Sequence, residues 1–411
     1  MQLTSLKRLL RNLTTSTIGG AFAGAGFVSR LLGDRPGALD STRVRKILVI
    51  RLDLLGDLAL SMPAVQAIRR RYPTGQLDML VLPYTAPLLS GYDLVDHVRT
   101  FDVNALRPSG DMFNRTCYRE LLRLVRDLRD ERYDLAVSLY GCWGSALAFA
   151  SGARWRVGYA GESFRFMHNL PVPGQRYRVH RHELEYCLDL ARAAGATDLT
   201  TDARPILSSE SVTIARHLLG KNPTPDRPLV AIHVGALNGG AKRWTASGWA
   251  AVAGRLMREH GVQVVFVGAE RERQLIDDVL QQMSEQPLVL AGQTPIPVLL
   301  AVMDQCTILL SGDSGPLHLA MALGVPTVAV HGPTDPALSG PYGPHARIVR
   351  RALPCSPCYD LRNTAECWRG DHACMTSITP EEVYRAAVEQ IETAPRRPPL
   401  DLTTTSEGSP T

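Results

Sequence analysis

Short, almost continuous apolar runs alternate along this chain with longer stretches in which apolar residues recur every three or four positions. Unbroken apolar runs are typical of parallel strands buried on both faces, and the periodic stretches are typical of helices. The alternation occurs in two series. The first predicts strands at residues 46–50, 77–82 and 134–139, and helices at residues 58–71 and 118–132. The second predicts strands at residues 229–234, 262–267, 288–291, 307–310 and 326–330, with helical patterns between them, one of which opens at residues 317–323. The sequence therefore predicts an α/β protein with two doubly wound, parallel-sheet domains.

The two series also define the expected domain organisation. We expect a first domain at residues 44–205 and a second at residues 229–394, separated by a helix and linker at residues 206–228. The length of 411 residues is ample for two domains of ordinary size. Residues 395–411 are rich in Pro, Ser and Thr and are predicted to be disordered. In doubly wound sheets ligands bind at the carboxyl ends of the strands, so site residues are expected there.

The charge balance does not point to a nucleic-acid partner. The formal net charge is only +5, and no basic stripe is interleaved with aromatic residues. In the leader, residues 1–43, Lys7, Arg8 and Arg11 precede an apolar, Gly-rich stretch that is too short to span a membrane. Three interpretations of this leader stay open: a cleaved signal peptide, a segment resting on an anionic membrane surface, and a mobile leader.

The turn after the strand at residues 307–310 has the composition of an anion site. Asp313 or Ser314 can cap the helix that follows, and Pro316 suits the first helical turn because its missing N–H would have had no partner. Gly315 lets another molecule approach the backbone closely. A helix N-terminus with free N–H groups suits a phosphate. The plainer alternative is an ordinary capped turn between a strand and a helix.

Polar residues also follow the first strand of the chain. Gly56 permits a tight turn, and Asp57 opens the helix predicted after it. Asp57 can be a helix N-cap, which would be sufficient to explain it. Alternatively, Asp57 is a carboxylate at the mouth of a cleft that takes a proton from a hydroxyl.

A glycine-containing loop after the strand at residues 229–234 leads to Lys242 and Arg243, which suit a diphosphate unless they are simply solvated. Glu270 ends the next strand, where it can bind ribose hydroxyls or cap a helix. No G-x-G-x-x-G with an acid about 20 residues later follows a strand, and no P-loop is present. A dinucleotide-binding domain is therefore not supported.

Taken together, these motifs resemble glycosyltransferase family 9, the heptosyltransferases of lipopolysaccharide core synthesis. The resemblance covers residues 44–393 and rests on the order and spacing of its parts. The matching parts are residues 47–52 with Gly56, Asp57 and Pro63; His233 with Gly235; Lys242 with Trp244; residues 268–270; residues 312–318; and the cysteines Cys355, Cys358 and Cys374.

The resemblance implies a GT-B architecture, in which two Rossmann-like doubly wound domains face a central cleft. The second domain would hold a nucleotide-sugar, and the first would hold the acceptor. The implied reaction is an inverting transfer that requires no cofactor or metal, most simply of heptose from ADP-heptose to a hydroxyl of a lipid-linked or other glycan acceptor of the lipopolysaccharide core. The implied location is the cytoplasm. If the leader is the segment that rests on an anionic membrane surface, we expect peripheral contact at the inner face of the inner membrane.

The resemblance also implies roles for individual residues. Asp57 would deprotonate the acceptor hydroxyl, Lys242 would neutralise the leaving diphosphate, and Glu270 would hold the ribose. The other expected donor-binding residues are His233, Gly235, Asp313, Ser314, Gly315 and His318, and the expected acceptor-side residues are Arg51, Asp53 and Gly56. Because two acids would repel an anionic donor, we expect Asp313 to bind a sugar hydroxyl or to cap the helix.

Two features depart from the family pattern. Many heptosyltransferases have Ser or Thr at the position of Asp53, and an acid there can alter the acceptor or compete with Asp57 for the role of base. The leader before Val44 is longer than the resemblance requires. Three function classes stay open: a glycosyltransferase, with heptose or with another nucleotide-sugar and acceptor; a nucleotide-sugar epimerase of the same fold; and a non-catalytic binding protein.

The last cysteines of the chain form a cluster within residues 354–375. Cys355, Cys358, Cys367 and Cys374 have the spacing C-x₂-C-x₈-C-x₆-C, of which only the first pair matches a zinc or iron–sulfur site. We expect a reduced, loop-packed cluster in preference to a metal site. The remaining cysteines, Cys117, Cys142, Cys187 and Cys306, are expected to be small buried residues.

Overall fold

The computed structural model describes residues 37–106, 115–162, 167–174, 176, 180–220, 227–237, 239–359 and 366–394. The predicted tail and all but the end of the predicted leader lie outside these residues, as does part of the predicted linker. The chain divides into two compact units, of which the first ends at Ala203 and the second begins at Arg204.

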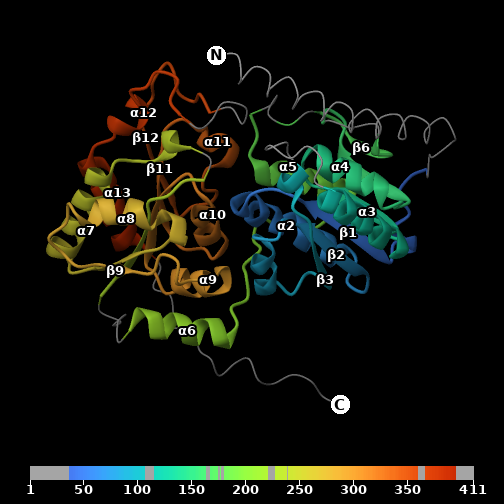
Figure 1. Ribbon diagram of the computed structural model, residues 1–411, viewed down its shortest axis with the longest axis horizontal. Coiled ribbons are helices and arrows are strands. Elements are labelled where there is room, and N and C mark those ends of the chain that lie inside the picture. Colours follow the sequence, from blue (N-terminus) through green and yellow to red (C-terminus); the bar gives the residue numbers. More distant parts are fainter. Residues whose placement is uncertain are drawn as a thin grey trace. The chain divides into compact units, whose positions relative to one another are not determined.

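The described residues of the first unit form a parallel sheet with the order β3-β2-β1-β4-β5-β6 (Figure 1). The strands are β1 (Lys46–Arg51), β2 (Gln76–Val81), β3 (His97–Thr100), β4 (Leu135–Ser138), β5 (Trp155–Tyr159) and β6 (Leu170–Val172). The α-helices are α2 (Leu55–Arg71), α3 (Arg115–Asp130), α4 (Gly141–Ala150) and α5 (Glu183–Ala193), and short 3₁₀ turns are η1 (Ser41–Arg43), η2 (Ala86–Gly91) and η3 (Val103–Leu106). This is the Rossmann strand order, in which the order reverses beside the first strand.

The described residues of the second unit form a parallel sheet with the order β12-β11-β10-β7-β8-β9. The strands are β7 (Leu229–His233), β8 (Gln263–Phe266), β9 (Leu288–Val289), β10 (Ile308–Gly312), β11 (Thr327–His331) and β12 (Ala346–Arg350). The α-helices are α6 (Ser209–Leu219), α7 (Ala246–His260), α8 (Arg273–Leu280), α9 (Ile296–Asp304), α10 (Gly315–Ala322), α11 (Pro336–Ser339), α12 (Ala373–Thr376) and α13 (Pro380–Thr393), with 3₁₀ turns η5 (Gly240–Lys242) and η6 (Glu270–Glu272). The same Rossmann order therefore occurs a second time.

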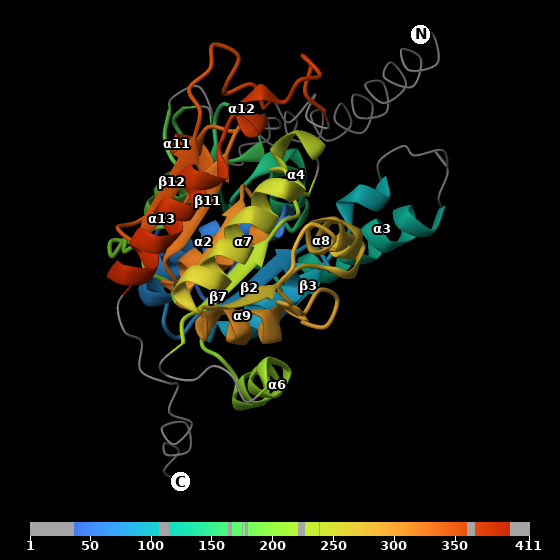
Figure 2. The same ribbon diagram turned by 90° about the vertical axis from the view of Figure 1, so that its left-hand side faces the viewer.

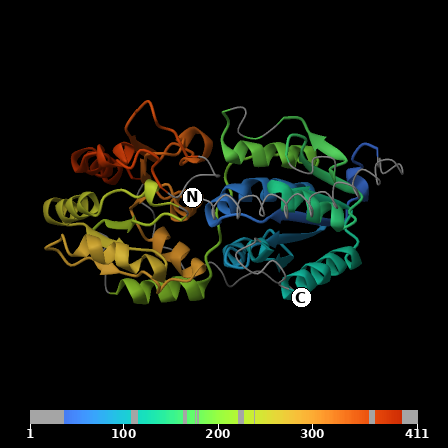
Figure 3. The same ribbon diagram turned by 45° about the horizontal axis from the view of Figure 1, so that its top comes forward.

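Helix pairs cover the sheet of the second unit. Helix α7 packs against α13, and the two are seen side by side in Figure 2. Helix α6 packs against α9, as the lime and orange helices in Figure 3 show. These helices bring their apolar residues together with a sheet whose central strands β7 and β10 are wholly buried, which explains the continuous apolar runs in the sequence.

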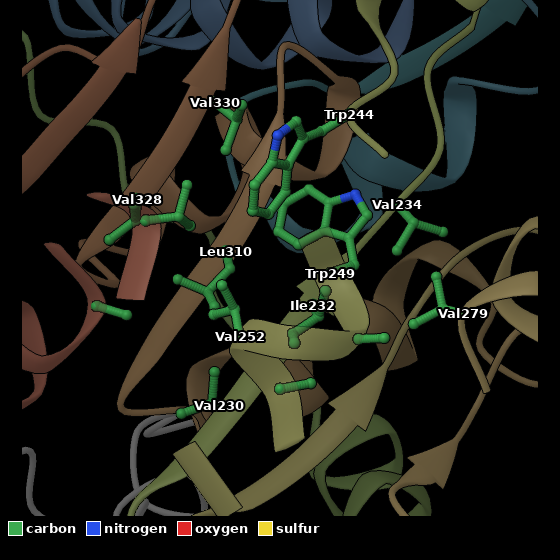
Figure 4. Close-up of a cluster of buried hydrophobic side chains, with 14 of the residues drawn as sticks. Val230, Ile232, Val234, Trp244, Trp249, Val252, Val279, Leu310, Val328 and Val330 are labelled. Atoms are coloured by element: carbon green, nitrogen blue, oxygen red, sulfur yellow. The ribbon is translucent and has the colours of Figure 1, made fainter. Parts of the chain in front are cut away.

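The core of the second unit contains two tryptophans that stack edge to face (Figure 4). The ring centroids of Trp244 and Trp249 lie 4.9 Å apart, and the indole nitrogen of Trp244 donates a hydrogen bond of 3.2 Å to the carbonyl of Ile378. Buried aromatic rings of this size contribute strongly to core stability. Trp244 therefore fixes the backbone just after Lys242.

The predicted strands are confirmed within about two residues at each end. Strands β3, β5, β6 and β12 were not predicted. The residues of β3 are mostly exposed and those of β12 only partly buried, so these two strands do not show the continuous apolar pattern that identifies a central strand. Three helices begin earlier than predicted, at Leu55, at Arg115 and at Gly315.

The early start of α2 corrects one interpretation of Asp57. The N-cap residue of α2 is Leu54, and Asp57 lies inside the first helical turn. An acid in the first turn is favourable because of the helix dipole, but Asp57 does not cap this helix. Its side chain is 29 % exposed and so remains accessible for another role.

Candidate functional site

Most of the predicted site residues follow the strands at which the order of each sheet reverses, whereas Glu270 follows β8. In the first unit this point lies between β1 and β4, and in the second between β7 and β10. Loops that leave the carboxyl ends of such neighbouring strands diverge to opposite faces of the sheet and leave room for a ligand. Each unit therefore places its predicted residues where a doubly wound domain binds ligands.

In the second unit, Lys242 and Asp313 form an ion pair. The ammonium nitrogen lies 3.0 Å from the carboxylate, and the side chains are only 12 % and 9 % exposed. Burial acts to raise the pKa of the Asp313 carboxyl, but Lys242, His331 and His318 outweigh it, so this pKa lies below its usual range. Asp313 is therefore paired with a lysine from the loop after β7.

The turn before α10 differs from one sequence expectation. Ser314 is the N-cap residue, but among the described residues neither it nor Asp313 makes a side-chain capping bond to this helix. The Ser314 hydroxyl instead pairs with the Ser311 hydroxyl at 2.8 Å, and Asp313 pairs with Lys242. Since no side chain caps it in the described structure, the N-terminus of α10, opened by Gly315, keeps N–H groups for a ligand.

A chain of polar contacts links the strand ends behind this turn. The Nε2 atom of His233 lies 3.3 Å from Glu272, and its Nδ1 atom lies 3.4 Å from the Ser311 hydroxyl. Burial acts to raise the pKa of Glu272, but His233 and the N–H of Ala269 lower it to about 2. A carboxylate on one imidazole nitrogen fixes the orientation of the ring. Glu272 thus holds His233 in place at the end of β7.

Gly235 is explained by the same carboxylate. A Cβ atom at this position would lie 1.8 Å from an oxygen of Glu272, so any larger residue would displace it. Glu270, which was predicted from the sequence, lies instead beside Gly292, where a Cβ atom would be 2.0 Å from its carboxylate oxygen. The structure therefore brings His233, Gly235 and Glu272 together, while Glu270 lies next to a different loop.

The depressed pKa of Glu272 predicts a contribution to acid stability. Because its folded pKa of about 2 lies below the ordinary 4.5, its stabilisation is fully present above pH 4.5 and is lost as the pH falls toward 2. We expect Glu272→Gln to lower stability by about 2–3 kcal/mol at pH 6, with the difference shrinking as the pH falls through that range. Urea unfolding of both proteins between pH 6 and pH 2.5 measures this. If the difference in the free energy of unfolding between the two proteins did not change with pH, the loss would come from packing alone.

In the first unit, Arg51 is fully buried among carboxylates at the end of β1. One guanidinium nitrogen, Nη1, lies 2.8 Å from Glu183, and the other, Nη2, lies 3.5 Å from Asp53 and 3.4 Å from Asp57. Burial raises the pKa of Asp53 above its usual range despite the opposing effect of Arg51. The neighbouring Gly56 is buried in the first turn of α2. The predicted acceptor-side residues therefore form one cluster around a single arginine.

A second arginine supports this cluster. Arg176 pairs with Glu183 at 2.5 Å and with Glu162 at 3.1 Å, and its guanidinium lies over the ring of Tyr140, as does that of Arg51. Neither Arg176 nor Glu183 was predicted. They come from segments far along the chain from β1, and no local motif marks them.

The four clustered cysteines are free thiols. Burial, and then the neighbouring thiols, raise the pKa of Cys374 to about 11, which disfavours the thiolate that a metal needs. In the parts of the chain that the structure describes, no group of three or more His, Cys, Asp or Glu side chains is arranged to hold a metal ion. Residues 360–365 of the predicted Cys-rich loop lie outside those parts. Of the other cysteines, Cys117, Cys187 and Cys306 are buried as predicted, and Cys142 is partly exposed.

The family model described as glycosyltransferase family 9 (heptosyltransferase) matches residues 121–369, more than half of the chain. The chain belongs to glycosyltransferase family 9. It is a glycosyltransferase enzyme, as its resemblance to that family implied.

Similar proteins agree with this assignment. The chain is 28% identical over 356 residues to lipopolysaccharide heptosyltransferase 2 of Escherichia coli K12, which covers 82% of this chain and 96% of that relative. It is 28% identical over 354 residues to lipooligosaccharide heptosyltransferase 2 of Haemophilus ducreyi, over 83% of this chain and 97% of the relative.

Solved structures confirm the predicted fold class, GT-B with two Rossmann-like doubly wound domains. A family 9 glycosyl transferase from Veillonella parvula has a TM-score of 0.72 at 23% identity and covers 87% of this chain and 99% of its own. The ADP-heptose lipopolysaccharide heptosyltransferase II of E. coli has a TM-score of 0.67 at 23% identity, with 84% and 98% covered.

Within the described residues of this family 9 enzyme, no helix is both long enough and apolar enough to cross a membrane.

Proposed function

We propose that this family 9 glycosyltransferase moves heptose from ADP-heptose to a sugar hydroxyl of a lipopolysaccharide-core acceptor, with inversion and without a required metal. Its similarity to heptosyltransferases of lipopolysaccharide and lipooligosaccharide supports the choice of heptose and of a lipopolysaccharide acceptor. The observation that carries the proposal is the Lys242–Asp313 ion pair beside the uncapped N-terminus of α10.

The donor half of the proposal uses the second unit. Lys242 and the first N–H groups of α10 bind the diphosphate, Ser314 and Gly315 lie against it, and Asp313 accepts hydrogen bonds from sugar hydroxyls. Glu270 binds the ribose. His233, held by Glu272, and Gly235 form the wall at the end of β7, and His318 lies behind Asp313, whose pKa it lowers.

Charge balance supports transfer without a required metal. As the bond between the anomeric carbon and the diphosphate breaks, negative charge grows on the leaving phosphate oxygen. A buried ammonium group and the positive end of a helix both stabilise charge at that point. Lys242 and α10 provide these two groups on neighbouring loops.

The acceptor half uses the first unit. The acceptor hydroxyl oxygen attacks the anomeric carbon from the face opposite the diphosphate, and its proton passes to the Asp57 carboxylate. One bond forms as the other breaks, so the configuration inverts. Arg51, buried and held by Glu183, orients Asp57 and Asp53. Because Gly56 has no side chain, it leaves room for the acceptor beside Asp57.

The proposal includes cytoplasmic location and peripheral contact with the inner face of the inner membrane through the basic leader. That contact is supported by the sequence of the leader alone, because residues 1–36 lie outside the described residues. We also retain domain boundaries at residues 44–205 and 229–394 as a proposal.

The first test is nucleotide recognition. We expect ADP to raise the melting temperature of the wild-type protein more than GDP or UDP, and Lys242→Ala to weaken ADP binding by roughly ten- to a hundredfold, because a charged hydrogen bond to phosphate is lost. Lys46→Ala is the matched control, since Lys46 pairs with Glu131 in the first unit. If no nucleotide stabilises the wild type, the donor-site assignment is wrong.

The second part of the test is turnover with ADP-heptose and a heptose-terminated core acceptor, in the presence and absence of EDTA. Equal rates in both conditions support metal independence. Product formed from the donor without any acceptor would instead indicate an epimerase. Turnover only with another nucleotide-sugar would show that heptose is not the sugar transferred.

A further inference from the structure

Tyr359 lies over the ammonium group of Lys242. The centre of its ring is 4.4 Å from Nζ, well within the range of a cation–π interaction. Tyr359 directly follows Cys358 in the Cys-rich segment, which the proposed reaction does not use. This segment therefore contacts Lys242, which binds the diphosphate in the proposed function.

The backbone around Tyr359 is anchored to the turn after β11. The N–H groups of Cys358 and Tyr359 both donate to the carbonyl of Pro333, at 2.9 and 2.8 Å, and the Ser356 hydroxyl donates to the carbonyl of Gly332 at 2.6 Å. Three hydrogen bonds over four residues fix the backbone from which the Tyr359 ring reaches Lys242.

The far end of the same segment closes on the same turn. A Cβ atom at Gly332 would lie 2.3 Å from the sulfur of Met375 and 3.0 Å from that of Cys374, so α12 packs directly on this glycine. The turn after β11 is thus held between both ends of the Cys-rich segment. Packing of Cys374 and Met375 in this way supports the turn to which the backbone of Tyr359 is bonded.

The Asp313 carboxylate, at 3.0 Å, and the Tyr359 ring both contact the Lys242 ammonium and help to define its position. A lysine side chain has a flexible four-carbon stem, so an unsupported ammonium would lose entropy on meeting a phosphate. A ring face that already fixes the ammonium reduces this loss, and it excludes water that would weaken the electrostatic attraction.

We propose that Tyr359 is a positioning residue for Lys242, and that residues 355–359 of the Cys-rich segment are in this way part of the donor site. This inference rests on the proposed function of Lys242 as the diphosphate ligand. The inference gives a role to a segment that takes no part in the proposed reaction.

The test compares Tyr359→Phe with Tyr359→Leu, using ADP as the probe and calorimetric titration of the full chain. Phenylalanine retains the ring face, so ADP affinity should stay within about twofold of wild type. Leucine fills similar space without a ring, and we expect ADP to bind about two- to thirtyfold more weakly. Tyr342→Leu is the control, because Tyr342 is an exposed tyrosine of the same unit.

A double-mutant cycle separates positioning from a general structural effect. In a Lys242→Ala background, Tyr359→Leu should cause no further loss of ADP affinity, because the ammonium that the ring positions is gone. The proposal is overturned if Tyr359→Leu costs the same in both backgrounds, or if it costs nothing in the wild type. Failure of the wild type to bind ADP would count against the proposed function itself. Intact ADP binding that depends on Lys242 and not on Tyr359 would count against this inference alone.

Discussion

An Asp57→Asn variant should lose glycosyl transfer by about 10²- to 10⁴-fold while binding ADP as tightly as the wild type. Asparagine keeps the shape of the side chain and cannot accept a proton, so the variant removes the proposed base function together with one negative charge beside Arg51. Initial rates with ADP-heptose and acceptor measure the loss, and titration with ADP confirms that the donor site is intact.

Asp53→Asn is the matched control for this experiment, because Asp53 faces the same arginine nitrogen from nearly the same distance. We expect it to change the Michaelis constant for the acceptor more than the turnover number. If Asp53→Asn abolished turnover and Asp57→Asn retained it, the two carboxylates would have exchanged the roles we assign to them. This outcome has a physical basis, since burial raises the pKa of Asp53 and thus makes it a stronger base.

The second large effect is expected on stability. Glu183→Gln removes the negative charge that lies between Arg51 and Arg176, both of which are buried. The described carboxylates that remain beside these two arginines lie 3.1 Å away or farther. Removing the nearest charge from a buried ion-pair cluster is costly, and we expect the first unit to lose about 3–5 kcal/mol. Hydrogen exchange at the amides of β1 and α5 measures the change, and the amides of β7 and β10 serve as an internal reference.

Glu185→Gln supplies the comparison that this measurement needs. Glu185 is two residues further along α5 and pairs with Arg181, but both of these side chains are more than a third exposed. Its replacement should cost less than about 1 kcal/mol. Similar losses for the two variants would show that the buried cluster contributes no more than an exposed pair.

Much of the fold could be predicted from the sequence, because the central strands are apolar throughout. Strands β1, β2, β4, β7, β8, β10 and β11 all appear where expected. The unpredicted β3 and β12 lie at the sheet edges, where side chains are partly exposed and the pattern is weaker. The sequence predicts a later start for α2 because its N-cap residue, Leu54, has no side-chain acceptor and so gives no N-cap signal.

The candidate site was only partly predictable, and the reason lies in sequence separation. Residues within one loop, such as Asp53 and Asp57, could be found from a local pattern. Glu183 contacts Arg51 across 132 positions, and Glu272 contacts His233 across 39, so neither contact leaves a local trace. Glu272 also lies two residues from Glu270, and a pattern alone cannot decide which of two nearby acids faces the strand end.

The ion pair of Lys242 with Asp313 has a consequence for the end of each catalytic cycle. In the proposed donor site, Asp313 acts as an internal competitor for the lysine that the diphosphate needs. An intact donor offsets this competition, because its sugar supplies hydroxyls for Asp313. Once the sugar has been transferred, ADP alone leaves Asp313 without those partners, and the carboxylate again attracts Lys242. If the proposed site is right, departure of the spent nucleotide is favoured over its retention, and we expect weak product inhibition that depends on a residue remote from the bond that breaks.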